Sequence, residues 1–364
     1  MFDKGKKMKK IVCLSLALLL SVPEFSAQAA EDNTKENSIF SFFNFGGNEK
    51  KPVDKTQTAE KKEPEETKLQ RLTREADSGN LNSQMALGYI YLYGEDDIKI
   101  DQKKAFHYYQ LAATQNDDIA VNNLASLYYS GIGVGQDFAM AAELFKKAVQ
   151  LGNIEAAVNL AFLYLAGSGV QKDSKEAINY FVIAAQAGNP TAQFMLGYAY
   201  YKGHVVPQDY ARAFDLLKVS ADAGYDDAQL MTGMLYRDGL GTPQNYGKSI
   251  NYLQKSLRQG NLNAMMMLAN MLTGGVKVTP NYATAHVLYN LASVRGAPEA
   301  AEERNNIEQR LNVEQLLQAQ AQADSYQERP SSLTQYIRQT FGKNIKSYID
   351  AAIAKRPVKT EKPV

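Results

Sequence analysis

The chain has 364 residues, of which 40 are Lys or Arg and 39 are Asp or Glu, so its formal net charge is only +1. Residues 1–29 hold five lysines and two acidic residues, which leaves 35 basic against 37 acidic residues in the remainder. Such a balance gives no general attraction to nucleic acid and does not favour an acidic substrate. Cys13 is the only cysteine, so the residues after it contain neither a disulfide nor a thiol nucleophile.

The first 29 residues are typical of a secretory signal peptide. Five lysines within Met1 to Lys10 precede the apolar run Ile11 to Leu20, and the small residues from Ser26 to Ala29 suit a signal peptidase. We therefore expect cleavage after Ala29 and export to the bacterial periplasm or out of the cell. The apolar run is short for a permanent membrane helix, and an N-terminal anchor is the alternative.

Residues 30–67 are predicted to form a disordered linker. The stretch from Glu49 to Lys68 consists almost wholly of Lys, Glu, Thr, Pro and Gln, which cannot bury enough apolar surface to fold. The aromatic run from Ile39 to Phe45 is the exception. It is either a short docking motif or an apolar piece of a disordered arm.

A repeat of 36 residues follows the linker. Glycine recurs at this spacing at positions 152, 188, 224, 260 and 296, and Asn116 continues the series toward the N-terminus. Gly79 lies 37 residues before Asn116, so six copies extend from about Gly79 to Arg295. Self-similarity at a fixed period of this length is the signature of a repeat array.

The aligned copies assign a role to each recurrent position. Small residues on one face of a first helix let neighbouring helices approach, and a tyrosine in most copies fills the space beside them. A glycine ends this helix with a positive φ, and an Asp or Asn caps a second helix. The small residues are Ser83, Ala120, Ala156, Ala192, Ala228 and Ala264, then Gly88, Ala125, Ala161, Gly197, Gly233 and Ala269; the glycines are Gly94, Gly131, Gly167, Gly203, Gly239 and Gly275; the caps are Asp101, Asp137, Asp173, Asp209, Asn245 and Asn281.

This pattern resembles the Sel-one-like repeat family, a relative of the tetratricopeptide repeat. The resemblance is carried by Ala192 to Gly203 with Gln208 and Asp209, and by the run Gly131 to Asp137. It covers roughly residues 68–325. It implies an all-α fold, an α-solenoid wound as a right-handed superhelix of about six helix–turn–helix units with capping helices.

Helices are expected to cap both ends of the array. Leu69 to Ser78 matches a second helix and covers the first copy, whereas Pro298 to Arg310 and Val313 to Tyr326 close the far end. Residues 326–364 form a separate, basic amphipathic tail with a helical pattern that Gly342 weakens. Three interpretations of the tail remain open: docking back on the solenoid, binding a partner, or lying on an anionic membrane surface.

Catalytic patterns are missing from the sequence. It contains no Ser-x-x-Lys and no Lys-Thr-Gly motif, so a β-lactamase-like hydrolase ranks only third among the possible functions. The three histidines occupy different repeat positions, and the glycines at 131, 133 and 135 belong to a turn between helices. The acidic pairs Asp96–Asp97 and Asp226–Asp227 are explained as turn or capping residues. We therefore expect no enzymatic activity, no catalytic or metal-binding residue and no cofactor.

The predicted function lies on the inner, concave face of the solenoid. In the resembling folds the first helices line that face, and the positions flanking the small packing residue are exposed. Carried over residue by residue, these positions are Met85, Tyr89, Tyr93, Asn122, Ser126, Tyr129, Phe162, Phe194, Tyr198, Tyr201, Met234, Arg237, Met266 and Asn270. Exposed tyrosines at this density suit recognition, although the rings could instead pack between repeats.

We therefore interpret the chain as an exported scaffold that binds a protein or peptide partner. Asn122, Asn159 and Asn270 are candidates for bonding a peptide backbone. The alternative is binding of cell-wall glycan (peptidoglycan), in which the same tyrosines would stack on sugar rings. Membrane contact is expected only through the tail.

Overall fold

The computed structural model of the protein describes residues 66–95, 97–275, 278–342 and 344–353, and these residues form an all-α structure. Within those ranges the only bridge between extended residues is an isolated one that joins Glu95 and Ile98. The prediction of an all-α fold is confirmed. The predicted signal peptide and the aromatic run at 39–45 lie outside the described residues.

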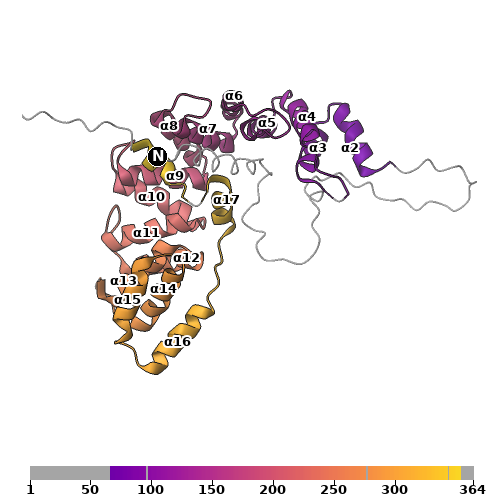
Figure 1. Cartoon of the computed structure of the whole chain (residues 1–364). Helices are drawn as coiled ribbons and strands as arrows, with labels where there is room; N and C mark the ends of the chain where they lie inside the picture. Colours follow the sequence, from indigo (N-terminus) through magenta and orange to yellow (C-terminus); the bar gives the residue numbers. More distant parts are fainter. Residues whose placement is uncertain (1–65, 96, 276–277, 343, 354–364) are drawn as a thin grey trace, which may run out of the picture.

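Six consecutive helix–turn–helix units make up the body of the molecule. The first helices are α3 (Leu81–Tyr93), α5 (Asp118–Ser130), α7 (Ile154–Ala166), α9 (Pro190–Lys202), α11 (Asp226–Asp238) and α13 (Leu262–Asn270). The second helices are α4 (Gln102–Ala113), α6 (Phe138–Gln150), α8 (Ser174–Gln186), α10 (Tyr210–Asp222), α12 (Tyr246–Arg258) and α14 (Tyr282–Val294). From α5 on, each first helix packs against the second helix of its own unit and of the preceding unit, which is the predicted solenoid (Figure 1).

The recurrent residues act as the sequence predicts. Every predicted capping Asp or Asn accepts a hydrogen bond from a backbone N–H in the first turn of its second helix. The small residues are buried, and at Gly88 there is no room for a side chain: a Cβ there would lie 2.9 Å from the ring of Tyr109. The first helices of copies two to five end at glycines with φ of 70–71°.

The sixth unit departs from this pattern. Helix α13 has 9 residues where the other first helices have 13, and it leads into a π-helical turn, η3 (Met271–Gly275). The positive φ that we expected at Gly275 falls on Gly274, at 102°. Two adjacent glycines let the chain leave the helix early, because neither carries a Cβ.

Helices cover both ends of the array. Helix α2 (Lys68–Asp77) packs on α3, and α15 (Pro298–Glu308) and α16 (Val313–Asp324) pack on α14. These bounds agree with the expected capping helices to within two residues. None of the described helices is both long and apolar enough to span a bilayer.

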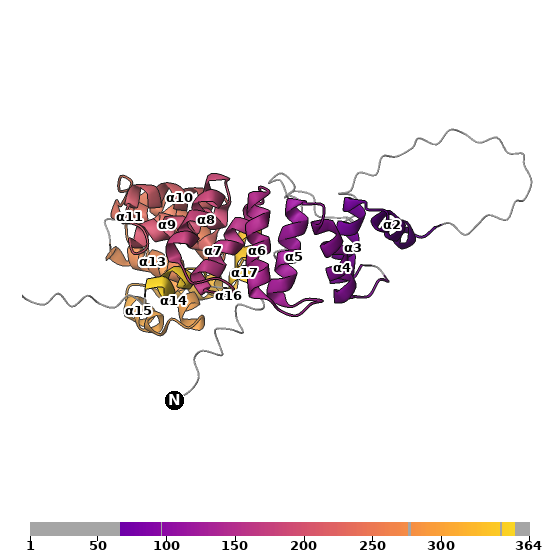
Figure 2. The same ribbon diagram turned by 90° about the horizontal axis from the view of Figure 1, so that it is seen from above.

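The chain turns back after α16. Figure 1 shows it rising from α16 to α17 (Ser332–Phe341), which lies on the inner side of the bend formed by the repeats; Figure 2 shows α17 beside α7, in agreement with the ring contact between Phe341 and Phe162. Gly342, with φ of 83°, ends α17, and a short helix, α18 (Ser347–Ile353), packs against α7. The glycine that we expected only to weaken one helix therefore separates two.

Candidate partner-binding surface

The C-terminal tail, residues 330–353, lies on the inner side of repeats three to five. Its contacts come from the first helices α7, α9 and α11 and from the turns that precede α11 and α13. We call these contact residues the tail-docking surface: Glu155, Phe162, Tyr198, Gly224, Asp226, Asp227 and Gln259. Of the three interpretations of the tail, docking back on the solenoid is what the structure shows.

Apolar side chains of the tail enter the core of the solenoid. Ile337, Phe341, Ile345 and Ile349 are buried in the same cluster as the repeat residues of α5 to α11. The ring of Phe162 is at the centre. It stacks on the ring of Phe341 with centroids 4.3 Å apart, and it packs in a T-shaped arrangement with the ring of Tyr348 at a centroid distance of 5.0 Å. Burying four such side chains stabilises docking by roughly 6–12 kcal/mol before the entropy cost of ordering the tail.

Two basic residues of the tail face two acidic residues at the start of α11. Nη2 of Arg338 lies 2.6 Å from Oδ2 of Asp226, and Nζ of Lys346 lies 3.4 Å from Oδ1 of Asp227. Both carboxylates also accept from the amide of Asn261. Burial and the neighbouring charge of Asp227 raise the pKa of Asp226, and Arg338 opposes that shift. The pair therefore needs a cation beside it to stay ionised at low cost.

Two phenols connect the tail to carboxylates. The hydroxyl of Tyr336 donates to Glu155 at 3.3 Å, and the hydroxyl of Tyr198 donates to Asp350 of α18 at 2.9 Å. Burial raises the pKa of Glu155, partly offset by its hydrogen bonds from Tyr336 and Asn189. Burial also raises the pKa of Tyr336 and of Tyr198 well above the ordinary value. The carboxylate that each phenol faces raises it further, because it would repel a phenolate.

A hydroxyl of the tail supplies a cap that α11 lacks. In α3, α5, α7, α9 and α13 an Asn or Asp at the N-cap accepts from the helix, but the N-cap of α11 is Tyr225, whose side chain makes no capping bond. Instead, Oγ1 of Thr334 accepts from the backbone N–H of Asp226 at 3.1 Å. The hydroxyls of Ser331 and Thr334 also donate to the carbonyl of Gly224.

The expectation that the predicted site residues face solvent is wrong for about half of them. The buried ones are Asn122, Ser126, Tyr129, Phe162, Phe194 and Tyr198. Phe162 and Tyr198 are covered by the tail. The others pack within the repeats: the Asn159 amide donates to Asn122 at 3.2 Å, Tyr129 contacts Phe138, and Phe194 meets Tyr225 edge-on at 4.7 Å.

The remaining predicted residues reach the surface to varying degrees. Tyr93 and Asn270 are exposed, and the partly exposed ones are Met85, Tyr89, Tyr201, Met234, Arg237 and Met266. They do not form one site: Tyr89 and Tyr93 contact each other in the first unit, whereas Asn270 accepts from Tyr289 in the sixth. The structure brings Phe162 and Tyr198 together under the tail and leaves the others spread along the array.

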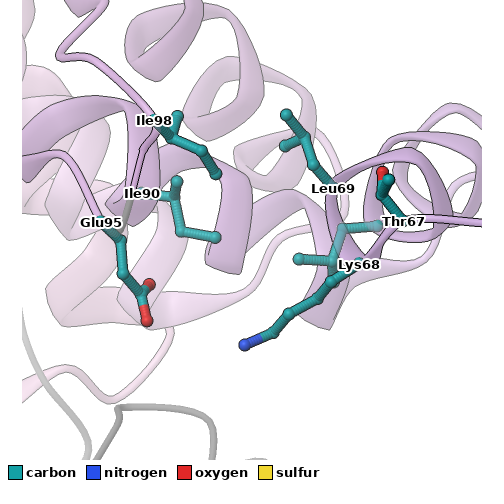
Figure 3. A pocket seen from close by; sticks show the side chains of 7 residues that line it. Thr67, Lys68, Leu69, Ile90, Glu95 and Ile98 are labelled. Carbon is teal, nitrogen blue, oxygen red and sulfur yellow. The ribbon is translucent and has the colours of Figure 1, made fainter.

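Other candidate sites offer less. A cavity of about 160 Å³ lies between α2 and α3, lined by Leu69, Leu72, Ile90 and Ile98, with Lys68 and Glu95 pointing to one side of it (Figure 3). It is the space beneath the N-terminal half-repeat. Among the described residues no group of three His, Cys, Asp or Glu side chains could hold a metal ion.

Reasoning from the sequence missed Glu155, Asp226, Asp227 and Thr334. The acidic pair lies at the start of a helix, as predicted, but it binds basic side chains and caps nothing. One signal was present. Tyr225 stands where the aligned copies have Asn80, Asp117, Asn153, Asn189 and Asn261, and this loss of a cap marks the repeat that depends on the tail.

Comparisons with known proteins agree with this architecture. The Sel1 repeat pattern matches residues 81–117, 119–153, 154–189, 190–225, 226–261 and 262–294. A protective antigen of uropathogenic Escherichia coli with an SLR fold is 28% identical, with a TM-score of 0.63 over 78% of this chain, which spans only 58% of that protein. A Sel1 repeat protein from Oxalobacter formigenes is 26% identical, with a TM-score of 0.52 over 62% of this chain and 90% of that one. None of the curated proteins matches the chain.

Proposed function

The chain belongs to the Sel1 repeat family, whose members generally act as scaffolds for protein–protein interaction, and from this premise we propose that it binds a segment of a protein partner on its inner face. The site is the tail-docking surface on repeats three to five. Phe162 and Tyr198, among the residues singled out in the sequence, provide its apolar centre. Asp226 and Asp227 provide its charge.

The observation that carries this proposal is the docked tail itself. The inner face accommodates a helical segment through buried aromatic contacts, two ion pairs and a capping hydrogen bond. These are the elements of a peptide-binding surface, in which an amphipathic helix lays its apolar face on an apolar surface and charges fix its register. A surface that holds this segment in cis has the chemistry to hold a similar one in trans.

No specific observation favours the glycan alternative. Stacking on a sugar needs an aromatic ring with an open face, and the rings of Phe162 and Tyr198 are covered by the tail. Membrane contact through the tail likewise lacks support, because in its described part Ile337, Phe341, Ile345 and Ile349 are buried, and Arg338 and Lys346 pair with carboxylates. We propose a non-catalytic role for the same reason: the inner face is occupied by packing and ion-pair contacts.

The proposal includes export from a bacterial cell. It rests on the lysines of Met1 to Lys10, the apolar run to Leu20 and the small residues before position 30. The bacterial sources of the two similar structures support a bacterial origin. Mass spectrometry of the protein from its own cell envelope should find a chain that begins at Ala30, whereas an intact Met1 would contradict cleavage after Ala29 and favour the N-terminal anchor.

Site-specific photo-crosslinking tests the binding site. A photoreactive residue placed at Tyr201 or Arg237, which are partly exposed and which the sequence predicts to lie on the inner face, should capture a defined partner in the native envelope. The same residue at the exposed outer positions Lys146 or Lys175 is the control. Replacing Asp226 and Asp227 by Lys should abolish the inner crosslink. Equal capture from inner and outer positions would contradict the proposal.

A further inference from the structure

We propose that the C-terminal tail is a tethered competitor for the tail-docking surface, and that the partner which displaces it is a basic, amphipathic helical segment that repeats the tail's contact pattern. This inference rests on the proposed function above and assigns both the chemistry of the partner and the regulation of the site. The tail would occupy the surface until such a segment replaces it.

The surface is unsuited to being left empty. Without the tail, Asp226 and Asp227 would lose the two cations that face them, and the first N–H of α11 would lose its acceptor. Phe162 would lose the rings of Phe341 and Tyr348 that cover it. Two adjacent carboxylates without a cation repel each other, and an open aromatic patch is unfavourable in water. An occupant therefore stabilises this surface, whether it comes from the tail or from a partner.

The contact pattern of the tail defines what an exchanging segment must carry. A hydroxyl at Thr334 caps α11, a phenol at Tyr336 reaches Glu155, and a guanidinium at Arg338 pairs with Asp226. Further along, the aromatic ring of Phe341 stacks on Phe162 and the ammonium of Lys346 pairs with Asp227. Cations at the first and ninth positions of a segment, with an aromatic residue between them, match the acidic pair and Phe162. The partner is thus a basic segment, opposite in charge to this surface.

The tail is built to detach more readily than a repeat helix. Its helices have 10 and 7 residues, and Gly342 separates them. Isolated helices of that length are marginal in water, so the released tail would not keep its structure. The side chains of Arg338 and Lys346 are about a quarter and a fifth exposed, so both ion pairs lie at the edge of the contact. An incoming basic segment can therefore reach the charges before it reaches the aromatic centre.

Fluorescence anisotropy of the full-length chain with a labelled synthetic peptide of residues 330–353 tests the inference. In the release variant, Arg338→Glu with Lys346→Glu, the tail faces the acidic pair with like charges, so it should leave the surface. The affinity for the free peptide should then rise about tenfold or more over that of the wild type, because a tethered competitor at an effective concentration of about 1 mM has that effect when the Kd of the tail sequence is about 0.1 mM or lower. Lys146→Glu with Lys175→Glu, the same charge change on the outer face, should behave as the wild type.

Matched peptides separate specific binding from apolar adhesion. A peptide carrying the same two Glu replacements should bind neither form of the protein. If the release variant loses its helical spectrum, Thr334→Ala replaces it as a milder test. Loss of that cap should raise peptide affinity about fivefold. Hydrogen exchange of the α17 amides should show the tail released in each variant that binds more tightly.

The outcomes distinguish this inference from the proposed function. Equal, tight peptide binding by the wild type and the release variant would overturn the tethered-competitor inference and leave the binding surface standing. A folded release variant that binds no peptide, while the Tyr201 crosslink still depends on Asp226 and Asp227, would also overturn only the inference. Loss of both the peptide binding and the Tyr201 crosslink would overturn the inference and the proposed function. A wild-type mass that doubles in light scattering would place a second copy's tail on the surface and contradict a foreign basic segment.

Discussion

Arg338 of the tail and Asp226 of the fifth repeat are 112 residues apart in the chain, yet their side chains form an ion pair with an N–O distance of 2.6 Å. The carboxylate is almost fully buried and the guanidinium about a quarter exposed. Arg338 also lies beside the carbonyl of Gln259 at 3.4 Å. One tail residue thus contacts the starts of two successive repeats, α11 and the turn before α13.

Replacing Arg338 by Ala should loosen the tail, because Asp226 would then be buried beside Asp227 without its cation. The partial exposure of the pair places the loss at about 2 kcal/mol in the free energy of tail release, below the range for fully buried pairs. Amide exchange of α17 should become about thirtyfold faster. Native-state hydrogen exchange with mass spectrometry measures this directly.

The matched control removes the negative charge of the ion pair as well. Asp226→Asn in the Arg338→Ala background leaves no unpaired carboxylate at position 226, so it should recover part of the lost protection. If the free energy of tail release falls in the double variant by the sum of the losses in Arg338→Ala and Asp226→Asn alone, the ion pair does not couple these residues.

Two capping residues should respond differently to Ala. Asp173→Ala removes an ordinary cap of α8 and should lower the free energy of unfolding by about 1 kcal/mol without affecting the tail. Thr334→Ala removes the acceptor that the tail provides to α11, so it should accelerate exchange in α17 as well. Urea unfolding and hydrogen exchange on the same samples distinguish the effects. Identical exchange of α17 in the two variants would refute the capping role of Thr334.

The repeat architecture could be predicted because its determinants are local. Asp209 caps the helix that follows it, and Gly203 ends the helix that precedes it, so both roles depend on neighbours in sequence. Ala161 is a small residue that recurs at a fixed spacing, so its burial between helices could be predicted. In the sixth unit the same logic misplaced the positive φ at Gly275, because it did not weigh the adjacent Gly274.

The binding surface could not be predicted in the same way, because it forms between segments far apart in the chain. Periodicity identified Phe162 as a position on the inner face but did not show that Phe341 covers it. The acidic pair Asp226–Asp227 was interpreted as local capping residues, since no basic residue nearby in the sequence pairs with it. Only Tyr225, which breaks the column of capping residues, indicated that this repeat requires help from elsewhere.

Alkaline pH should loosen the tail. Burial raises the pKa of Tyr336 well above that of a free phenol, about 10. A raised pKa means that the contribution of this phenol to stability is complete below pH 10 and is lost as pH rises through the folded value. The deprotonated oxygen would repel Glu155. Peptide binding in trans and urea unfolding between pH 8 and about 11 follow the change.

Tyr336→Phe should flatten this pH dependence, since the replacement cannot ionise, while Tyr246→Phe on α12 should leave it unchanged. A dependence that is equally steep in both variants would show that another group controls alkaline release.

Gly224 and Gly188 occupy the same position in successive repeats and offer a paired test of the tail contact. Both have positive φ, 102° and 89°, so Ala at either site should cost about 1–2 kcal/mol of backbone strain. They differ in what a Cβ would meet: nothing within 4 Å at Gly188, but the Cβ and Oγ of Ser331, each at 3.3 Å, at Gly224. Gly224→Ala should therefore displace Ser331 and accelerate exchange in α17, whereas Gly188→Ala should only lower the melting temperature. Equal protection of α17 in both variants would mean that Ser331 does not anchor the tail at this turn.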